Sequence, residues 1–157
     1  MNPKSLAPVI PRGTVADMLE VKGTAVHAIA PGETVYEAIR RMTELRVGAL
    51  MVMDGQKLIG VISERDYTRK VMLHGRASPD TRVEEIMSSP VITVTPQLTL
   101  RECMETTTKH QIRHLPVVEG DAVIGVLSIN DLVRTIVAQQ AETIESLNSY
   151  IAGDYPA

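Results

Sequence analysis

Short hydrophobic runs separated by polar turns follow the same order twice along this chain. Each copy begins with a short apolar run that a proline ends, and it continues with an amphipathic helical pattern. Two β-rich runs and a second helical pattern complete the copy. The pattern therefore predicts strand, helix, strand, strand, helix, twice over. The expected strands are residues 26–29, 49–53 and 57–63 in the first copy and 91–94, 114–118 and 122–128 in the second.

The two copies are related by a constant shift of 65 residues. The shift places GVISERD, residues 60–66, on GVLSIND, residues 125–131, and no gap is needed anywhere in the repeat. A unit of roughly 50 residues would be marginally stable alone, because so small a chain buries little apolar surface. We therefore expect the two units to pack sheet against sheet with pseudo-twofold symmetry, in a mixed α/β (α+β) fold.

Cap and turn residues mark the ends of the expected elements. The segments TVYE (34–37) and TLRE (99–102) are expected capping boxes, in which Thr caps the helix and Glu bonds back to the Thr backbone. Gly55 and Gly120 stand where each hairpin turns and can supply the positive φ of a tight turn. These positions agree between the copies, which supports the repeat at the level of local structure.

The repeats divide the chain into five expected segments. Residues 73–82 are polar with Gly and Pro, which is typical of a linker, and short helical turns at 16–19 and 84–87 lead into the repeats. The last helical pattern continues to Gly153, so it either packs on the body or meets another chain. The segments are a 1–14 N-terminal segment, a 15–72 first repeat, the 73–82 linker, an 83–138 second repeat and a 139–157 C-terminal helical tail.

Composition narrows the classes of function. The chain has 157 residues, a net charge of −3 and no Phe or Trp, so its overall charge and its few aromatic side chains count against nucleic-acid binding, while the net charge leaves a local basic patch open. Cys103 is the single cysteine, which excludes an intrachain disulfide and fits a reducing compartment. No apolar run reaches the length of a membrane span, and the first residues lack the form of a signal peptide. We expect a cytoplasmic protein with neither a membrane nor a nucleic-acid partner.

The repeated S-x-x-D motif has a structural and a functional interpretation. Ser63 and Ser128 suit the cap position of a helix, with Asp66 and Asp131 in its first turn, and capping is the simpler interpretation of either copy alone. The same helix start leaves backbone N–H groups that attract phosphate. A carboxylate beside it can accept two hydrogen bonds from a vicinal diol. Phosphate donors and a diol acceptor together favour a ribonucleotide ligand.

The repeated motif resembles the cystathionine β-synthase (CBS) domain, and the tandem arrangement is similar to a Bateman module. The resemblance rests on GVISERD and GVLSIND with GALMV and RHLPVV before them, and it covers about residues 15–138. It implies two ligand clefts between the repeats, a homodimer and a regulated target protein. The ligands that it implies are adenosine compounds: AMP, ADP, ATP or NAD, with S-adenosylmethionine ranked behind them.

The family's site, placed on the matching positions of this sequence, gives one cleft for each repeat. In each cleft the resemblance assigns the ribose to the Asp and the phosphate side to the Ser. The first cleft comprises Thr24, Val26, Ala28, Gly48, Ala49, Leu50, Ser63, Arg65 and Asp66. The second comprises Ser89, Val91, Thr93, Arg113, His114, Leu115, Pro116, Ser128, Asn130 and Asp131. Because Arg113 and His114 replace Gly48 and Ala49, we expect the second cleft to bind a phosphorylated ligand more tightly.

Other chemistries find less support in the sequence. No nucleophile, base and orienting group stand out as a set, and no glycine-rich phosphate loop occurs. Cys103, His110 and His114 do not form a tight metal-binding cluster. We therefore predict a regulatory sensor of adenine nucleotides that carries out no reaction. The alternative is a protein-interaction subunit with vestigial clefts that acts through its C-terminal helix, and a nucleotide-processing enzyme is the third interpretation.

Overall fold

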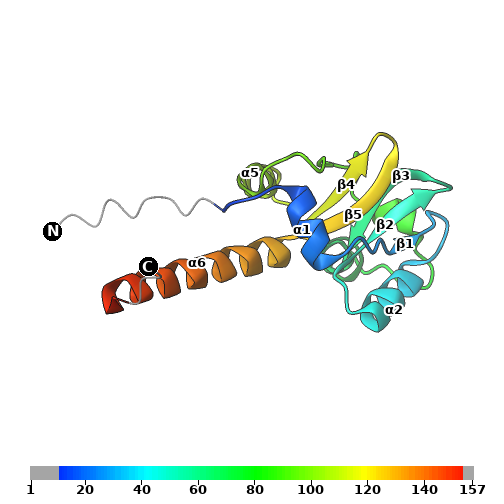
Figure 1. Cartoon of the computed structure of the whole chain (residues 1–157). Coiled ribbons are helices and arrows are strands. Elements are labelled where there is room, and N and C mark those ends of the chain that lie inside the picture. The colour runs from blue at the N-terminus through cyan, green and yellow to red at the C-terminus, as the bar shows by residue number, and fades with distance from the viewer. Residues whose placement is uncertain (1–10, 154–157) are drawn as a thin grey trace.

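Two small β-sheets, one from each repeat, form the centre of the molecule, and helices surround them (Figure 1). The structure is a computed structural model and describes residues 11–153. The first ten residues of the expected N-terminal segment and the last four of the expected tail lie outside the described residues. The mixed α/β architecture with two matching units confirms the fold predicted from the repeat.

The first sheet has the order β1-β2-β3, with β1 parallel and β3 antiparallel to β2, and the second sheet is the antiparallel pair β4-β5. Both hairpins turn at the expected glycines, Gly55 with φ 61° and Gly120 with φ 60°. In chain order the elements are α1 (Val15–Lys22), β1 (Ala28–Ile29), α2 (Val35–Leu45), β2 (Ala49–Asp54), β3 (Lys57–Ser63), α3 (Glu64–Asp66), the π-helix η1 (Tyr67–Met72), α4 (Val83–Ile86), α5 (Leu100–His110), β4 (His114–Glu119), β5 (Ala122–Ser128) and α6 (Ile129–Ala152).

The first strand of each repeat is shorter than predicted. Residues 26–29 contribute only Ala28–Ile29 to a strand, and residues 91–94 form no strand at all. Val94 alone bridges to Val117 of β4. Pro90 stands just before this segment and has no N–H to donate to a sheet, which favours an irregular path up to Val94. The apolar pattern was therefore a sign of burial here rather than of a continuous strand.

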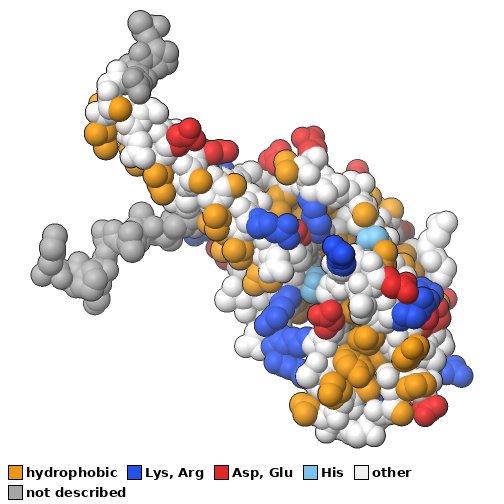
Figure 2. All heavy atoms as spheres, turned by 90° about the horizontal axis from the view of Figure 1, so that it is seen from below, with side chains coloured by type: hydrophobic (Ala, Val, Ile, Leu, Met, Phe, Trp, Pro, Cys, Tyr) orange, Lys and Arg blue, Asp and Glu red, His pale blue; other side chains and the backbone are white. Residues whose placement is uncertain are grey.

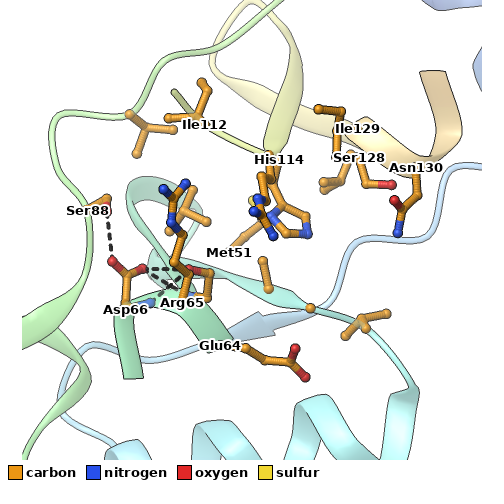
Figure 3. Close-up of a pocket in the computed structure, with 18 of the residues that line it drawn as sticks. Met51, Glu64, Arg65, Asp66, Ser88, Ile112, His114, Ser128, Ile129 and Asn130 are labelled. Carbon is orange, nitrogen blue, oxygen red and sulfur yellow. Dashed lines mark hydrogen bonds between the residues drawn. The ribbon is translucent and has the colours of Figure 1, made fainter. Parts of the chain in front are cut away.

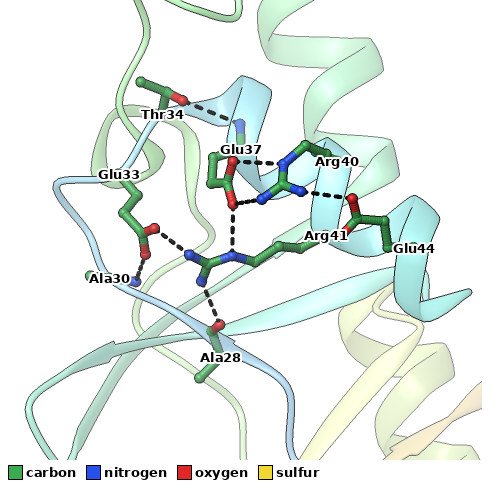
Figure 4. A network of polar contacts seen from close by, with 8 residues as sticks. All are labelled: Ala28, Ala30, Glu33, Thr34, Glu37, Arg40, Arg41 and Glu44. Atoms are coloured by element: carbon green, nitrogen blue, oxygen red, sulfur yellow. Dashed lines mark hydrogen bonds and ion pairs between the residues drawn. The ribbon is translucent and has the colours of Figure 1, made fainter.

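The two expected capping boxes differ in outcome. The box at residues 99–102 is complete, with the Glu carboxylate accepting from the cap N–H at 2.9 Å. At the start of α2, Thr34 accepts from the Glu37 N–H, but the Glu37 carboxylate bonds to Arg40 and Arg41 instead of returning to the cap (Figure 4). The hydrogen bond from Arg40 holds the pKa of Glu37 at about 2. Two guanidinium groups thus compete successfully with one backbone N–H for this carboxylate.

Each short lead-in helix packs on the other repeat. The buried side chains of α1, which are Val15, Met18 and Leu19, belong to the hydrophobic core of the second repeat. Those of α4, Val83 and Ile86, belong to the core of the first repeat. The sequence had suggested that each lead-in turn accompanies the repeat that it precedes. The repeats are therefore joined by a reciprocal exchange of helices as well as by their shared interface.

Matching backbone hydrogen bonds fix the two lead-in helices. The Val15 N–H donates to the Leu98 carbonyl at 2.9 Å, and the Leu100 N–H donates to the Gly13 carbonyl at 3.0 Å, so α1 starts beside the start of α5. The equivalent pair of bonds, at 2.8 and 2.9 Å, ties the start of α4 to the start of α2. The pseudo-twofold relation thus extends to the crossing helices.

Two glycines make room for these crossings. A Cβ atom at Gly125 would lie 2.7 Å from Cδ2 of Leu19, and one at Gly60 would lie 2.4 Å from Sδ of Met87. Both distances are shorter than a side chain tolerates without displacement. The glycines that open the repeated motif therefore allow close approach of the lead-in segments to β3 and β5.

Helix α6 continues past the body and projects from it (Figure 1). Its cap Ser128 and its end at Gly153, with φ 77°, agree with the predicted limits of the helix. Leu132 is the one residue of α6 that is buried, and every residue from 140 to 153 is exposed. None of the side chains in this outer part of the helix is therefore buried against the described body.

Candidate functional site

A cavity of about 880 Å³ lies between the two repeats, and both repeats line it (Figure 3). Met51 and Val61 of the first sheet and Val126 of the second provide apolar wall. Polar side chains come from the starts of α3 and α6. Because each repeat contributes equivalent elements, the two expected clefts are joined in one continuous cavity.

Both helix starts have the predicted capping geometry. The Asp66 N–H donates to Ser63 Oγ at 3.2 Å, and the Ser63 N–H donates to Asp66 Oδ2 at 3.0 Å. The corresponding distances between Ser128 and Asp131 are 3.2 and 2.8 Å. The capping interpretation is therefore confirmed in both repeats. The caps also hold the two carboxylates at the cavity in the same orientation relative to their strands.

The two capping carboxylates have different neighbours. Asp66 accepts from Ser88 Oγ at 3.3 Å and lies 3.0 Å from Lys70 Nζ of the next helical turn. Asp131 accepts from Lys22 Nζ at 2.5 Å. Lys22 is the last residue of α1, the lead-in helix of the first repeat that packs on the second repeat. A neutral hydroxyl thus occupies in one cleft the place that an ammonium group occupies in the other.

Ser88 and Lys22 also bond to equivalent strand residues. Ser88 exchanges two backbone hydrogen bonds with Val61, at 2.8 and 3.1 Å, whereas the Lys22 ammonium donates to the carbonyl of Val126. Burial alone would raise the pKa of Asp131, but hydrogen bonds from Lys22 and the cap serine, with the Lys22 charge, hold it below its usual value. Asp131 is therefore a carboxylate at neutral pH.

The cavity is positively charged although the whole chain has a net charge of −3. Three carboxylates line it, which are those of Glu64, Asp66 and Asp131. Figure 2 shows Lys and Arg side chains gathered on one face of the body around histidines. Because like charges concentrate in a recess of low dielectric, the cavity attracts anions. The seven cationic residues of the lining are Lys22, Arg46, Arg65, Arg69, Lys70, Arg113 and Arg134.

His114 lies between the two halves of the cavity, at the start of β4 (Figure 3). Burial lowers the pKa of His114, the charges of Lys22 and Arg113 lower it further, and Asp131 opposes them. The imidazole is therefore neutral at pH 7 and can both donate and accept a hydrogen bond. An anion bound nearby would favour its protonation.

The structure brings together eleven of the nineteen residues predicted for the site. Those that line the cavity are Gly48, Ala49, Ser63, Arg65, Asp66, Val91, Arg113, His114, Ser128, Asn130 and Asp131. Those that lie outside its lining are Thr24, Val26, Ala28, Leu50, Ser89, Thr93, Leu115 and Pro116. The structure gives the position of all nineteen residues, and the role of each one toward a ligand stays a prediction.

Alternation along extended backbone accounts for most of the residues outside the lining. Leu50 and Leu115 point into the hydrophobic cores, while Ala49, Met51 and His114 beside them face the cavity. Ala25 and His27 line the cavity where the residues one position later had been expected. A shift of one residue along extended backbone moves a side chain to the opposite face. The prediction was one residue too late in this segment, so it selected side chains that face away from the cavity.

Several lining residues were not among the nineteen predicted for the site. Arg69 and Arg134 occupy the same place in the two repeats, three residues after each capping Asp, and that repetition was a usable signal. Lys22 carried no such signal, because its contact depends on the crossing of α1. Within residues 11–153, no three His, Cys, Asp or Glu side chains are grouped as a metal site.

Comparisons with known proteins agree with this geometry. The family model described as "CBS domain" matches residues 15–73 and 83–138. The mitochondrial CBS domain-containing protein CBSX3 of Arabidopsis thaliana is 39% identical over 151 residues, which are 90% of this chain and 73% of that protein. YhcV of Bacillus subtilis is 31% identical over 109 residues, 69% of this chain and 77% of that protein.

Solved structures show the same arrangement. A protein with CBS domains from Burkholderia ambifaria has a TM-score of 0.79 and 44% identity, covering 82% of this chain and 96% of its own. The CBS pair of MJ0100, solved with 5′-methylthioadenosine and S-adenosyl-L-methionine, has a TM-score of 0.73 at 23% identity, covering 82% and 99%.

Between residues 11 and 153, no helix combines the length with the apolar content that crossing a bilayer requires. The expected cytoplasmic location stays a prediction, since one relative is a mitochondrial protein. The repeated helix caps, the crossing lead-in helices and the shared cavity thus coincide with two family matches that span most of the chain. The chain belongs to the CBS-domain family and carries two CBS domains in tandem.

Proposed function

We propose that this protein is a regulatory module that binds a phosphorylated adenosine compound between its repeats and carries out no reaction on it. The observation that carries the proposal is the pairing of two capped carboxylates, Asp66 and Asp131, with seven cationic side chains around one cavity. Carboxylates suit a ribose diol, and the cations suit phosphate. The apolar strand faces suit a base.

The charge of the cavity supports a ranking of ligands. AMP, ADP, ATP and NAD all carry phosphate and fit an excess of positive charge. S-adenosylmethionine carries a sulfonium cation and no phosphate, so the same excess disfavours it. The carboxylate of Asp131 has two cationic side chains beside it, Lys22 at 2.5 Å and Arg134 at 3.8 Å, which supports tighter binding of the phosphorylated ligand in the second half of the cavity.

Regulation would follow from the position of the ligand between two bodies. A compound that contacts both repeats changes their relation only if it binds one arrangement more tightly than another. The cross-repeat hydrogen bond from Arg65 to the Gln111 carbonyl, at 3.3 Å, lies in the cavity lining and is a contact that a ligand would change. We propose a cytoplasmic target protein as the receiver of that change.

Thermal denaturation with each nucleotide tests the proposal. A ligand present at about 100 times its Kd stabilises the folded state by about 2.7 kcal/mol, which raises the Tm. We expect a rise with at least one of AMP, ADP, ATP and NAD, and no rise in a variant with both Asp66→Asn and Asp131→Asn. Mass spectrometry of the nucleotide after incubation should recover it unchanged, and turnover would contradict a non-catalytic role.

The exposed α6 supports a second candidate, an interaction subunit whose clefts are vestigial and whose C-terminal helix recruits a partner. The same experiment separates the two functions. If no adenosine compound raises the Tm at millimolar concentration, the interaction subunit becomes the better description.

A further inference from the structure

The outer half of α6 presents a hydrophobic stripe to solvent. All residues from 140 to 153 are exposed, the apolar ones included. Val137 is 61% exposed, Ile144 59%, Leu147 57% and Ile151 81%. Figure 2 shows hydrophobic side chains along one edge of this helix and acidic side chains along the other. A surface helix normally buries such a stripe, so this one indicates an interface.

The stripe follows a seven-residue repeat. Val137, Ile144 and Ile151 occupy one position of the heptad, and Val133 and Leu147 occupy the other core position. β-branched residues at the first position favour two parallel strands where leucine holds the second, and Leu147 provides that combination in the outer heptad. The family match ends at residue 138, so most of the stripe is additional to the CBS domains.

We propose that α6 pairs with α6 of a second copy of this chain, as a parallel two-stranded coiled coil over residues 133–151. The side of α6 that faces its own chain is a different one. Gln139 bonds to the backbone of Arg12 at 2.8 and 2.9 Å, and Glu142 lies 3.8 Å from the Arg12 guanidinium. These contacts of Gln139 and Glu142 with Arg12 therefore lie outside the seam.

The charges of the helix select a second copy over a lipid surface. Ala141, Thr143 and Asn148 flank the outer part of the seam and are uncharged, so these parts of two identical helices meet without like-charge repulsion, and the charged flanking residue Arg134 lies at the inner end beside the body. Residues 135–153 contain Glu142 and Glu145 but no Lys or Arg. An anionic membrane surface attracts basic helices and would repel this one.

The length of the helix sets the strength of the pairing. Its 24 residues extend about 36 Å at 1.5 Å per residue, which allows three heptads. Gln140 occupies one core position and replaces a hydrophobic layer with a polar one, which favours a fixed register at a cost in stability. The dimer therefore dissociates on dilution.

Sedimentation of the full chain tests the pairing. We expect Ile144→Lys with Leu147→Lys to weaken self-association roughly 100-fold, because two layers of the seam acquire like charges. The matched control, Ser146→Lys with Ser149→Lys, adds the same charges to the same turns on the other side and should associate as the wild type does. Circular dichroism checks that both variants stay folded.

A disulfide test fixes the orientation. In a parallel pair Ile151→Cys lies beside its own mate and forms a covalent dimer on oxidation, whereas Ser149→Cys lies outside the seam and does not. An unlinked Ile151→Cys chain would overturn the parallel arrangement. Self-association that is equally tight in the Ile144→Lys, Leu147→Lys variant, a wild-type chain that stays monomeric, or binding of the stripe to vesicles or another protein instead of its own copy, would overturn the proposal.

Discussion

Lys22 and Asp131 lie 109 residues apart in the chain, and their side chains meet at 2.5 Å in the cavity. The contact joins the lead-in helix of the first repeat to the helix cap of the second. In the other half of the cavity the matching contact to Asp66 comes from the uncharged hydroxyl of Ser88, at 3.3 Å, and the nearby ammonium group is that of Lys70, one helical turn further along the same segment. The internal symmetry of the molecule is therefore broken by one ammonium group at the centre of its candidate site.

Replacement of Lys22 by Met should destabilise the protein by about 1 kcal/mol at pH 7, since it leaves the largely buried Asp131 carboxylate without its main partner. The folded-state pKa of Asp131 is lowered, so the stabilisation is present above the unfolded value near pH 4 and is lost as pH falls through the folded value. Urea denaturation should show the difference between variant and wild type shrinking below about pH 4. Lys57→Met is the matched control at an exposed strand end and should change little. An equal cost for the two variants would contradict a specific contact.

Calorimetric titration should rank the two carboxylates. Asn keeps the helix cap at either position but loses the charge, so Asp131→Asn and Asp66→Asn test ligand contact with little effect on the helix start. We expect Asp131→Asn to weaken nucleotide binding more, because Lys22 and Arg134 both lie within 4 Å of that carboxylate and hold it in place at the cavity. Greater weakening from Asp66→Asn would reverse the ranking of the two clefts.

Gly125→Ala should cost about 1–3 kcal/mol in the free energy of unfolding, because the added methyl group overlaps Leu19 and forces α1 away from β5. Gly60→Ala should cost at least as much, since the added Cβ would lie 2.4 Å from Sδ, 2.9 Å from Cγ and 3.2 Å from Cβ of Met87, so that the whole side chain must move. Gly32→Ala is the control, as a Cβ there meets no atom within 4 Å. Chemical denaturation measures all three, and a Gly125→Ala chain as stable as the control would show that α1 adjusts freely.

His114 should make the protein less stable in weak acid. Burial lowers its folded-state pKa, so the unfolded chain binds the proton first, and stability falls as pH drops from about 6.5 toward the folded value. His114→Gln should remove this part of the loss between about pH 7.5 and pH 5.5, whereas His74→Gln, at an exposed position, should retain it. If the two variants lose stability equally over that interval, His114 does not titrate as a buried group.

Cys103 should resist alkylation in the folded protein. It is fully buried in the core of the second repeat, and burial raises the pKa of its thiol to about 11. The reactive thiolate is therefore both scarce and inaccessible at pH 8. Iodoacetamide should label it only after urea unfolds the chain, as mass spectrometry can follow. Rapid labelling without denaturant would show that the core opens locally.

The repeat in the sequence predicted the parts of the fold that depend on local chemistry. Both serine caps, both glycine turns and the long C-terminal helix follow from residues that lie near one another in the chain, and the structure has all of them. Local competition explains the partial failure at Glu37, where neighbouring arginines take the carboxylate. Element type was therefore easier to predict than the partner of each side chain.

The lining of the cavity was harder to predict, because it depends on phase and on distant crossings. Leu50 and Leu115 were expected at the site, yet each is fully buried in a core, because neighbouring residues of a strand face opposite ways. Lys22 could not be placed from sequence, because nothing in its own segment indicates that α1 packs on the second repeat. The capping Asp and Ser residues reached the cavity because a helix cap fixes both position and direction.

The exchange of lead-in helices has a consequence for the order in which the chain is made. The first core is complete once α4 has left the ribosome, since every buried member of that core lies between Ile29 and Ile86. Helix α1 is synthesised earlier still, but its buried partners extend to Leu132. Val15, Met18 and Leu19 must therefore wait, with their apolar side chains uncovered, until almost the whole second repeat exists. The nascent chain most prone to aggregation therefore has a folded first repeat and an α1 that has not yet packed on the second repeat.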